Sequence, residues 1–203
     1  MINRKATFDN IRKEFSKLNI KQVQGFDANF DEFELWLSNK WIDKDSRKLA
    51  YILATDWHEG NKTMQPIKEI GSNAYFVKKY WENKKIAKEL GNLSAQDAIN
   101  YCGKGKPQLT GRSNYAKMGK ILGYDLVKNP DLMFDLKIAT EVMFEGMLTG
   151  RSFKGDFTGR QLENYFNKTT NDPIGARRVV NGTDKSELIA GYHYKFLKSI
   201  VFV

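Results

Sequence analysis

The stretch ATDWHEGNKTMQPIKEIG, residues 54–71, contains residue types that carry out acid–base chemistry. His58 and Glu59 are adjacent in it, and Glu69 follows ten residues after Glu59. Such a set suits a metal site, a pair of catalytic carboxylates, or a polar helix end that does no chemistry. These three interpretations need different neighbouring residues, so the surrounding sequence discriminates between them.

A metal site has the least support. A zinc-binding helix of the His-Glu-x-x-His type needs a histidine at position 62, which is Lys62. The only other histidine, His193, is distant in sequence, and Cys102 is the single cysteine. We therefore expect no metal ion and no other cofactor.

A pair of carboxylates suits the hydrolysis of a glycosidic bond, which needs two such groups flanking it. Glu59 lies seven residues after Ile52, so on a helical period it shares the face that Ile52 buries. Near the end of that helix, the helix dipole and partial burial both favour the protonated carboxyl group that a general acid needs. Gly60 is expected to close the helix in the left-handed conformation. The alternative is that Glu59 is an ordinary polar residue at a frayed helix end.

Glu69 is the candidate for the second carboxylate. Pro66 breaks helical structure between the two glutamates and lets the chain turn back toward Glu59. A simple surface charge is the alternative interpretation of Glu69. Other acids in the following segment are also candidates for the second carboxylate: Glu82, Glu89 and Asp97.

The stretch GKGKPQLTGRSNY, residues 103–115, is the third candidate feature. It is not a phosphate-binding P-loop, because no Gly-Lys-Ser/Thr sequence closes it. Its glycines allow close approach of the backbone to a ligand, and Gln108, Thr110 and Asn114 supply uncharged hydrogen-bonding groups. These groups suit sugar hydroxyl and N-acetyl groups, and a plain turn before the next helix is the alternative.

The elements that must position these residues are mostly helices. Phe8, Ile11, Phe15 and Leu18 show helical spacing behind Thr7 as a cap. Further helices are expected over 23–37, from Asp45 or Ser46 to Trp57, over 113–122, over 135–149, and over 184–200 with Asp184 as the cap. Residues 100–112 predict a loop or short strand. The sequence predicts one mainly α domain over 1–203, which includes the N-terminal helices of 1–44 and a small irregular or β-containing lobe around 60–112.

Composition and charge narrow the function classes. Hydrophobic residues make up 41% of the chain, which suits a globular protein, and no apolar run is long enough for membrane contact by a transmembrane helix. The N-terminus has no apolar signal segment and the single cysteine fits a reducing compartment, so we expect synthesis in a cytoplasm. The net charge of +9 favours an anionic partner such as a bacterial cell wall. Nucleic acid is not expected as a partner, because no known binding motif accompanies the charge.

Four motifs in order resemble the family 19 glycoside hydrolases, and more narrowly the chitinase-like endolysins of bacteriophages and prophages. The motifs are LAYILATDWHE, TMQPIKEIG, YCGKGKPQLTGRSNYAKMGKILGYDLVKNPDL and GARRVVNGTDKSELIAGY. Upstream, FSKLNIKQVQGFD resembles the segment that precedes the catalytic helix in those endolysins. The resemblance implies a lysozyme-like, mainly helical fold with a substrate cleft between two lobes.

The resemblance also implies roles for individual residues. Glu59 matches the general acid, Glu69 takes the place of the base that activates water, and Thr110 matches the residue that helps to hold that water. Substrate binding is implied for residues in the neighbouring motifs: His58, Gln108, Asn114, Tyr115 and Asn181. The chain departs from the family pattern where it has Gly60 in place of threonine and Lys104 in place of arginine. These two changes bear on rate and substrate preference, because neither removes a carboxylate.

The expected activity is hydrolysis of the β-1,4 bonds of peptidoglycan glycan strands by an inverting acid–base mechanism, as in a lysozyme-like endolysin. A chitinase acting on N-acetylglucosamine polymers is the nearest alternative, and a catalytically impaired glycan-binding descendant is the alternative from another class. As an endolysin the protein is expected to be a monomer, made in the cytoplasm of a host bacterium without a signal peptide. It is then expected to act on the cell wall after release.

Overall fold

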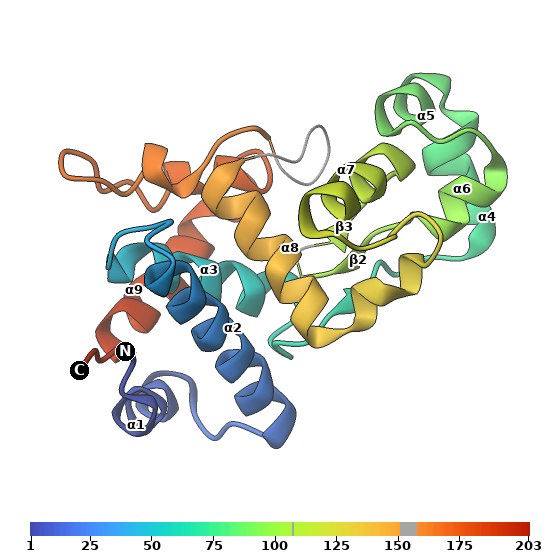
Figure 1. Ribbon diagram of the computed structural model, residues 1–203. Coiled ribbons are helices and arrows are strands. Elements are labelled where there is room, and N and C mark those ends of the chain that lie inside the picture. The colour runs from blue at the N-terminus through green and yellow to red at the C-terminus, as the bar shows by residue number, and fades with distance from the viewer. Residues whose placement is uncertain (107, 151–157) are drawn as a thin grey trace.

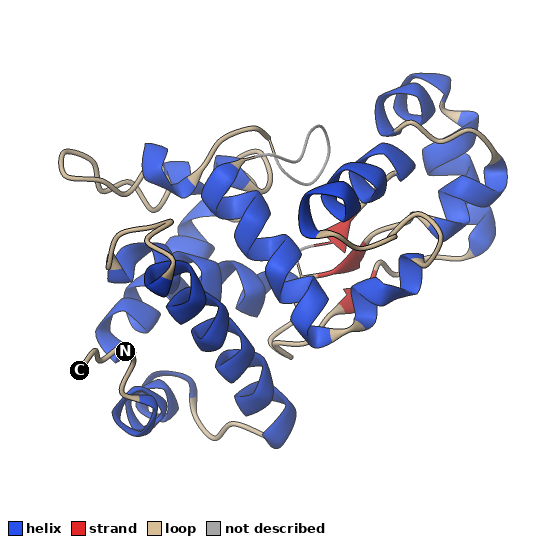
Figure 2. Cartoon of the chain, in the orientation of Figure 1, coloured by secondary structure: helices blue, strands red, loops and turns tan. Residues whose placement is uncertain are grey.

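The computed structural model describes residues 1–106, 108–150 and 158–203. The described chain is mainly helical and carries one small sheet, as the sequence predicts (Figures 1 and 2). The longer helices form the larger lobe: α1 (Arg4–Phe15), α2 (Ile20–Ser38), α3 (Ser46–Glu59), α7 (Arg112–Leu122), α8 (Leu136–Thr149) and α9 (Ser186–Ser199). Short 3-10 turns connect them: η2 (Pro130–Phe134), η3 (Leu162–Asn164) and η4 (Gly175–Val179). None of the helices in these ranges has the length and apolarity needed to cross a bilayer.

The smaller lobe follows the sheet's first strand and lies at the right of Figure 1. It consists of α4 (Asn73–Val77), a π-helical turn η1 (Lys78–Glu82), α5 (Lys84–Leu90) and α6 (Ala95–Asn100). The lobe has an apolar cluster of its own: Phe76, Tyr80, Leu90, Ala98 and Cys102. The prediction of a small β-containing lobe is therefore confirmed, with helices that the loop-like composition around residues 60–112 did not indicate.

The sheet has three short antiparallel strands in the order β1 (Ile67–Lys68), β2 (Lys104–Gly105) and β3 (Gln108–Leu109). Ile67 is paired with Gly105, and Lys104 with Leu109. Strand β2 also contacts helix α8 and the turn η2 of the larger lobe. Because β1 leads into the small lobe, the sheet connects the two lobes and carries the candidate residues that follow each strand (Figure 2).

Helix α3 lies at the centre of the larger lobe and is buried along ten consecutive residues, 48–57. It packs against α9, and its residues Leu49, Ile52 and Leu53 belong to the main apolar core. A helix that is covered on all sides is held in one position by its neighbours. The residue at its end is therefore presented from a rigid support.

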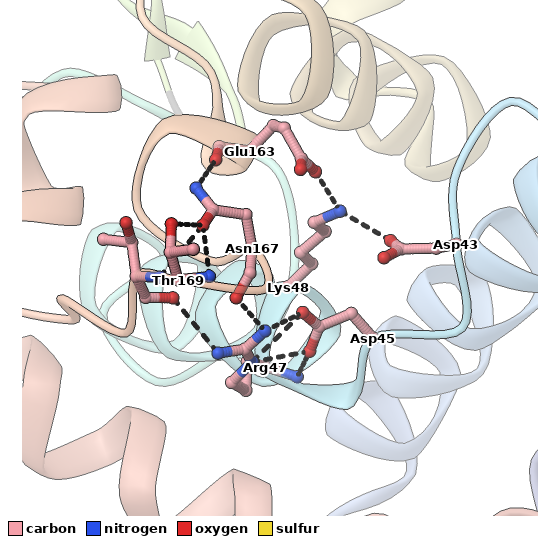
Figure 3. A network of polar contacts seen from close by, with 8 residues as sticks. Asp43, Asp45, Arg47, Lys48, Glu163, Asn167 and Thr169 are labelled. Atoms are coloured by element: carbon pink, nitrogen blue, oxygen red, sulfur yellow. Dashed lines mark hydrogen bonds and ion pairs between the residues drawn. The ribbon is translucent and has the colours of Figure 1, made fainter.

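A polar network fixes the start of α3 (Figure 3). Asp45 caps the helix by accepting a hydrogen bond from the backbone N–H of Arg47 at 2.9 Å. The Arg47 side chain donates to the carboxylate of Asp45 and to the carbonyl of Asn167 at 3.0 Å. Lys48, which is nearly buried, forms ion pairs with Asp43 and Glu163. These contacts connect the start of α3 to the segment around η3, which follows it by more than a hundred residues in sequence.

The predicted helices over 23–37, 113–122 and 135–149 are confirmed as α2, α7 and α8. The cap predicted for the first helix is wrong, because Asn3 caps α1 and Thr7 lies buried within it. There Thr7 accepts a hydrogen bond from the backbone of Val201, which joins the two ends of the chain. Asp184 is also not the cap of α9: the backbone carbonyl of Asp184 binds a side chain described below, and the helix begins after Lys185.

Candidate active site

Glu59 is the last residue of α3, and it is paired with a buried arginine from a distant part of the chain. Nη1 of Arg177 donates to Oε1 of Glu59 at 2.6 Å. The Arg177 side chain is only 3% exposed, whereas that of Glu59 is 26% exposed and accessible to a substrate. Arg177 is held in turn by its Nε, which donates to the carbonyl of Asp184 at 2.9 Å. The guanidinium of Arg177 thus lies directly against the Glu59 carboxyl group.

The predicted left-handed conformation of Gly60 is wrong. Gly60 has a φ of −78°, and the left-handed residues are the next two, Asn61 and Lys62, with φ of 48° and 63°. Asparagine tolerates this conformation better than most residues, so the turn does not need the glycine there. A Cβ at position 60 would lie 2.8 Å from the carbonyl oxygen of Asp56, so it is close approach to the preceding turn that favours glycine.

Glu69 follows β1 and is surrounded by hydrogen-bond donors. Its Oε1 accepts from Nζ of Lys79 at 2.8 Å and from the hydroxyl of Tyr75 at 3.4 Å. Its Oε2 accepts from the hydroxyl of Tyr80 at 2.8 Å and from the backbone N–H of Gly103 at 3.4 Å. The Glu69 side chain is 14% exposed. Four hydrogen-bond donors thus hold this carboxyl group in one orientation.

The hydrogen bonds around Glu69 also affect the pKa values of the side chains that donate them. Burial opposes the charge on Lys79, but hydrogen bonds to Glu69, Tyr80 and Tyr75 outweigh it and raise the pKa of Lys79 above its ordinary value. Burial likewise raises the pKa of Tyr80. At neutral pH Lys79 is therefore cationic and Tyr80 is a neutral donor.

The sheet brings Glu69 and Gln108 close to the same residue, Gly103. The N–H of Glu69 donates to the carbonyl of Gly103 at 2.8 Å, and Gln108 begins β3 opposite Gly105. A Cβ at Gly103 would lie 2.8 Å from Oε1 of Gln108 and 3.3 Å from Cβ of Glu69. Glycine at position 103 therefore leaves the space that both side chains occupy.

Thr110, Asn114 and Tyr115 lie together where β3 leads into α7. Asn114 donates from Nδ2 to the carbonyl of Thr110 at 2.7 Å, and the Tyr115 hydroxyl donates to the carbonyl of Cys102 at 3.2 Å. Thr110 is 8% exposed, Asn114 is 3% exposed and Tyr115 is fully buried. Asn114 and Tyr115 thus hold the loop that presents Gln108 and Thr110.

His58 and Asn181 lie on the side of Glu59. His58 is half-buried, and burial lowers its pKa, against the opposing effect of the Glu59 charge. Asn181 is exposed one turn after Arg177, and its Oδ1 accepts from the backbone N–H of Gly182 at 2.8 Å. The structure therefore places His58 next to Glu59 and Asn181 one turn after its partner Arg177, while Gln108 lies beside Glu69 at Gly103.

The alternative second carboxylates lie elsewhere in the small lobe. Glu82 and Glu89 are exposed on η1 and α5. Asp97 accepts from the backbone N–H of Leu93 at 2.8 Å and pairs with Nε of Arg112 at 3.6 Å, so it holds a turn together. Among these acids, Glu69 is the one that directly follows a strand of the sheet and is surrounded by hydrogen-bond donors.

A fully buried ion pair connects the two groups of site residues. Nζ of Lys106, in the turn after β2, lies 2.9 Å from Oδ2 of Asp56, and both side chains are inaccessible to solvent. Asp56 lies one turn before Glu59 on α3, and its Oδ2 also accepts from Asn29 of α2 at 2.8 Å. The end of α3 and the β2–β3 turn are thereby fixed relative to each other.

The sequence model of the family described as chitinase class I, glycoside hydrolase family 19, matches residues 23–156, which include both glutamates and the sheet. The chain belongs to glycoside hydrolase family 19. This family 19 protein is accordingly a glycoside hydrolase. No curated protein matches its sequence.

Solved structures of other family 19 enzymes share the fold. A bacterial family 19 chitinase superposes with a TM-score of 0.60 at 19% identity, covering 94% of this chain and 92% of its own. Chitinase C from Streptomyces griseus HUT6037 gives a TM-score of 0.56 at 17% identity, covering 94% of this chain and 74% of its own. A mutant of chitinase C gives a TM-score of 0.57 at 20% identity. At these identities the likeness establishes the lysozyme-like fold that the motifs implied.

Sequence reasoning missed three site residues of this family 19 enzyme. Arg177 was only part of a short basic run, although it stands within the quoted GARRVVNG motif. Lys79 and Tyr80 stand in FVKKYWENKK, where neither spacing nor residue type indicates contact with Glu69. Only the fold shows that Arg177 is buried against Glu59 and that η1 faces the end of β1.

Proposed function

We propose that this hydrolase cleaves the β-1,4 bonds of peptidoglycan glycan strands by an inverting acid–base mechanism. Glu59 gives its proton to the glycosidic oxygen as the bond to the anomeric carbon breaks. Glu69 takes a proton from a water molecule as that water attacks the same carbon from the opposite face, and Thr110 helps to hold the water. Each proton is accounted for, and no covalent intermediate forms.

The contacts of Glu59 support its role as the acid. Arg177 binds Oε1, while Oε2 has no hydrogen-bond partner among the described residues. The carboxyl group can therefore carry its proton on Oε2 and keep the bond to Arg177. In this arrangement Arg177 sets the direction of the acid and balances the charge that remains on Glu59 after proton transfer.

The contacts of Glu69 support its role as the base. Two of its four hydrogen bonds, from Tyr75 and from the backbone of Gly103, are long at 3.4 Å. Hydrogen bonds of this length are weak, so a water molecule can replace one of them at small cost. Lys79 and Tyr80 hold the carboxylate in place while it accepts the proton.

The observation that favours peptidoglycan is the charge of the protein. The chain carries +9 at pH 7, with 33 basic against 24 acidic side chains. A polymer with free carboxylates is attracted to such a surface, whereas chitin has no charge. In this role the protein is an endolysin that is made in a bacterial cytoplasm and acts on the wall after release. Expression with and without a pore-forming protein tests this, and culture lysis is expected only when both are present.

Chitin is the second candidate substrate. Solved structures with the same fold belong to proteins named as chitinases, and both polymers contain N-acetylglucosamine joined by β-1,4 bonds. The acid–base arrangement serves both equally, because the reacting atoms are the same. The two substrates therefore have to be compared directly.

The test is incubation of the protein with purified sacculi and, separately, with chitin oligosaccharides, with products identified by mass spectrometry. The proposal expects muropeptides with new reducing N-acetylmuramic acid ends, and a loss of at least about a hundredfold in rate in both Glu59→Gln and Glu69→Gln. Release from chitin alone would assign the protein to the second candidate. Loss in Glu59→Gln without loss in Glu69→Gln would overturn the role of Glu69. The anomer formed first, read by nuclear magnetic resonance, distinguishes inversion from retention.

A further inference from the structure

A basic pocket lies on the side of the larger lobe where α1 and α9 are neighbours (Figure 1). It is about 640 Å³ in volume, and four lysines surround an aromatic floor: Lys13, Lys17, Lys62 and Lys195 around Phe15 and Trp57. Its lining contains none of the residues assigned above to acid–base chemistry or to the sheet. It is thus a concave feature of the enzyme whose lining does not include the pair of glutamates.

The charges of the basic pocket are uncompensated. Glu14 is the only acid in its lining, which leaves a net charge of +3 from four lysines and one glutamate. Within residues 1–106, 108–150 and 158–203, none of the four lysines lies within ion-pair distance of a carboxylate. Lys195 makes a long contact, 3.4 Å, with the carbonyl of Glu14 and lies 5.4 Å from the centre of the Phe15 ring, and Lys13 makes a long contact with Asn10. The ammonium groups can therefore bind an external anion without breaking an internal ion pair.

The floor of the pocket is rigid and apolar. Phe15 stacks on Phe196 with ring centroids 4.4 Å apart and contacts Trp57 at 5.1 Å. Trp57 is 5% exposed, so only a small part of its ring reaches the pocket. Such an apolar floor suits methyl groups.

The backbone around the pocket is held in unusual conformations. Ser16 has a φ of 73° and a ψ of −167°, a region that is normally restricted to glycine. Lys62 also has a positive φ, and its carbonyl is bound by the side chain of Gln22 at 2.9 Å. Two chain segments that are distant in sequence thus adopt costly conformations at the edge of the same pocket, as is found at binding sites.

The pocket is close to the proposed acid along the chain. Trp57 lies in the last turn of α3, two residues before Glu59, and Lys62 lies in the loop after the helix, three residues after Glu59. Residues two apart in a helix point to roughly opposite sides, so Trp57 and Glu59 lie on different faces of the end of α3. The basic pocket thus borders the end of the helix that carries the proposed acid.

We propose that the basic pocket binds the free carboxylates of the peptide stems of peptidoglycan, which rests on the proposed peptidoglycan substrate. The stems branch from the glycan strand and carry both carboxylates for the lysines and alanine methyl groups for the aromatic floor. A chain of alditol phosphates supplies the charge but no apolar group for the floor. The pocket thereby selects glycan that carries peptide.

The test is calorimetric titration of a synthetic stem tetrapeptide, free of sugar, into the Glu59→Gln enzyme and into variants built on it. Lys17→Gln/Lys62→Gln is expected to raise the Kd of the peptide by about tenfold, since it removes two charge-assisted contacts. Lys120→Gln/Lys128→Gln is the matched control, because it removes the same charge from exposed positions outside the pocket, and it is expected to bind as the parent does. Added salt weakens binding to the parent.

Absence of binding, or equal binding by both double variants, overturns the inference. A polymer of ribitol phosphate is titrated in the same way. If Lys17→Gln/Lys62→Gln weakens binding of that polymer and not of the tetrapeptide, the pocket is reassigned to a phosphate-bearing wall polymer and the inference is overturned. Cleavage of sacculi is scored separately with enzyme that retains Glu59, with and without the Lys17→Gln/Lys62→Gln substitutions. Release of muropeptides without tetrapeptide binding would leave the proposed function intact and refute the role of the pocket. Tetrapeptide binding without release would support the role of the pocket and refute the proposed function.

Discussion

Arg177 and Glu59 are 118 residues apart in the chain and are joined by a hydrogen bond of 2.6 Å. Arg177 comes from the turn η4, and Glu59 ends the central helix α3. This pair fixes the last residue of α3. The network of Asp45, Arg47 and Lys48 fixes the first turn of the same helix (Figure 3). The central helix is therefore held at both ends by polar contacts to the C-terminal part of the chain.

We predict that Arg177→Gln lowers kcat by about a hundredfold, the loss typical of removing one preorganised electrostatic contact. The acid loses the donor that sets its direction, while KM changes little because Arg177 is buried away from the substrate. Arg178→Gln is the matched control, since Arg178 is the exposed neighbour, and it is expected to keep wild-type kcat. Steady-state kinetics on a soluble glycan oligomer check this. Equal kcat in both variants would contradict the role of Arg177.

We predict that Tyr80→Phe lowers kcat/KM by about tenfold, in line with the loss of one hydrogen bond to a charged group. The hydroxyl of Tyr80 lies 2.8 Å from Glu69, and the phenylalanine ring keeps the stacking on Phe76. Tyr75→Phe is the comparison, because its hydroxyl is 3.4 Å from the same carboxylate, and a change below about twofold is expected. Similar losses in both variants would show that the length of the contact does not determine its effect.

We predict that Lys106→Met lowers the free energy of unfolding by about 3–5 kcal/mol, because it leaves Asp56 charged and unpaired in the interior. Both side chains of this pair are inaccessible to solvent. Adding Asp56→Asn to Lys106→Met should recover a large part of the loss, since asparagine can still accept from Asn29. Urea unfolding of the two variants measures the difference. A double variant as unstable as Lys106→Met would show that the charge of Asp56 is not the cause.

We predict that acid weakens the fold through His193. Burial lowers the pKa of His193 from 6.5 to about 4 in the folded protein, and its ring is stacked on Phe166. As the pH falls below 6.5 the unfolded chain takes up a proton that the folded chain refuses until about pH 4. The free energy of unfolding therefore decreases through this window by about 3 kcal/mol, at 1.36 kcal/mol for each pKa unit.

His193→Phe removes this titration and keeps an aromatic ring in the same place. Urea unfolding at pH values across the window should show a smaller decrease in the variant than in the wild type. The same decrease in both proteins would assign the acid sensitivity to other groups. At neutral pH the two proteins are expected to differ little through protonation, because His193 is uncharged there in both the folded and unfolded states.

The helices that carry the site were predictable because their causes are local. Apolar spacing, the Asp45 cap and the glycines at 123 and 150 mark α3, α7 and α8 in the sequence, and the structure has them there. Capping was less predictable: Thr7 lies inside α1 and its hydroxyl bonds to the C-terminal segment, and α9 begins one residue later than expected, after Lys185. The small lobe was read as irregular, since its short helices are stabilised by their shared cluster around Phe76 rather than by their own periodicity.

The sequence by itself determined the family and the mainly helical class, and it predicted the two glutamates, because the ordered motifs and the helical spacing are properties of the chain itself. Only the tertiary structure decided the surroundings of those glutamates. Arg177 reaches Glu59, and Lys79 and Tyr80 reach Glu69, through packing between segments whose separation in sequence carries no signal. The basic pocket was unpredictable for the same reason, because the fold brings together lysines from α1 and the residues just after it, from α9 and from the loop after α3. Electrostatic surroundings depend on distances in space, and the fold alone sets those distances.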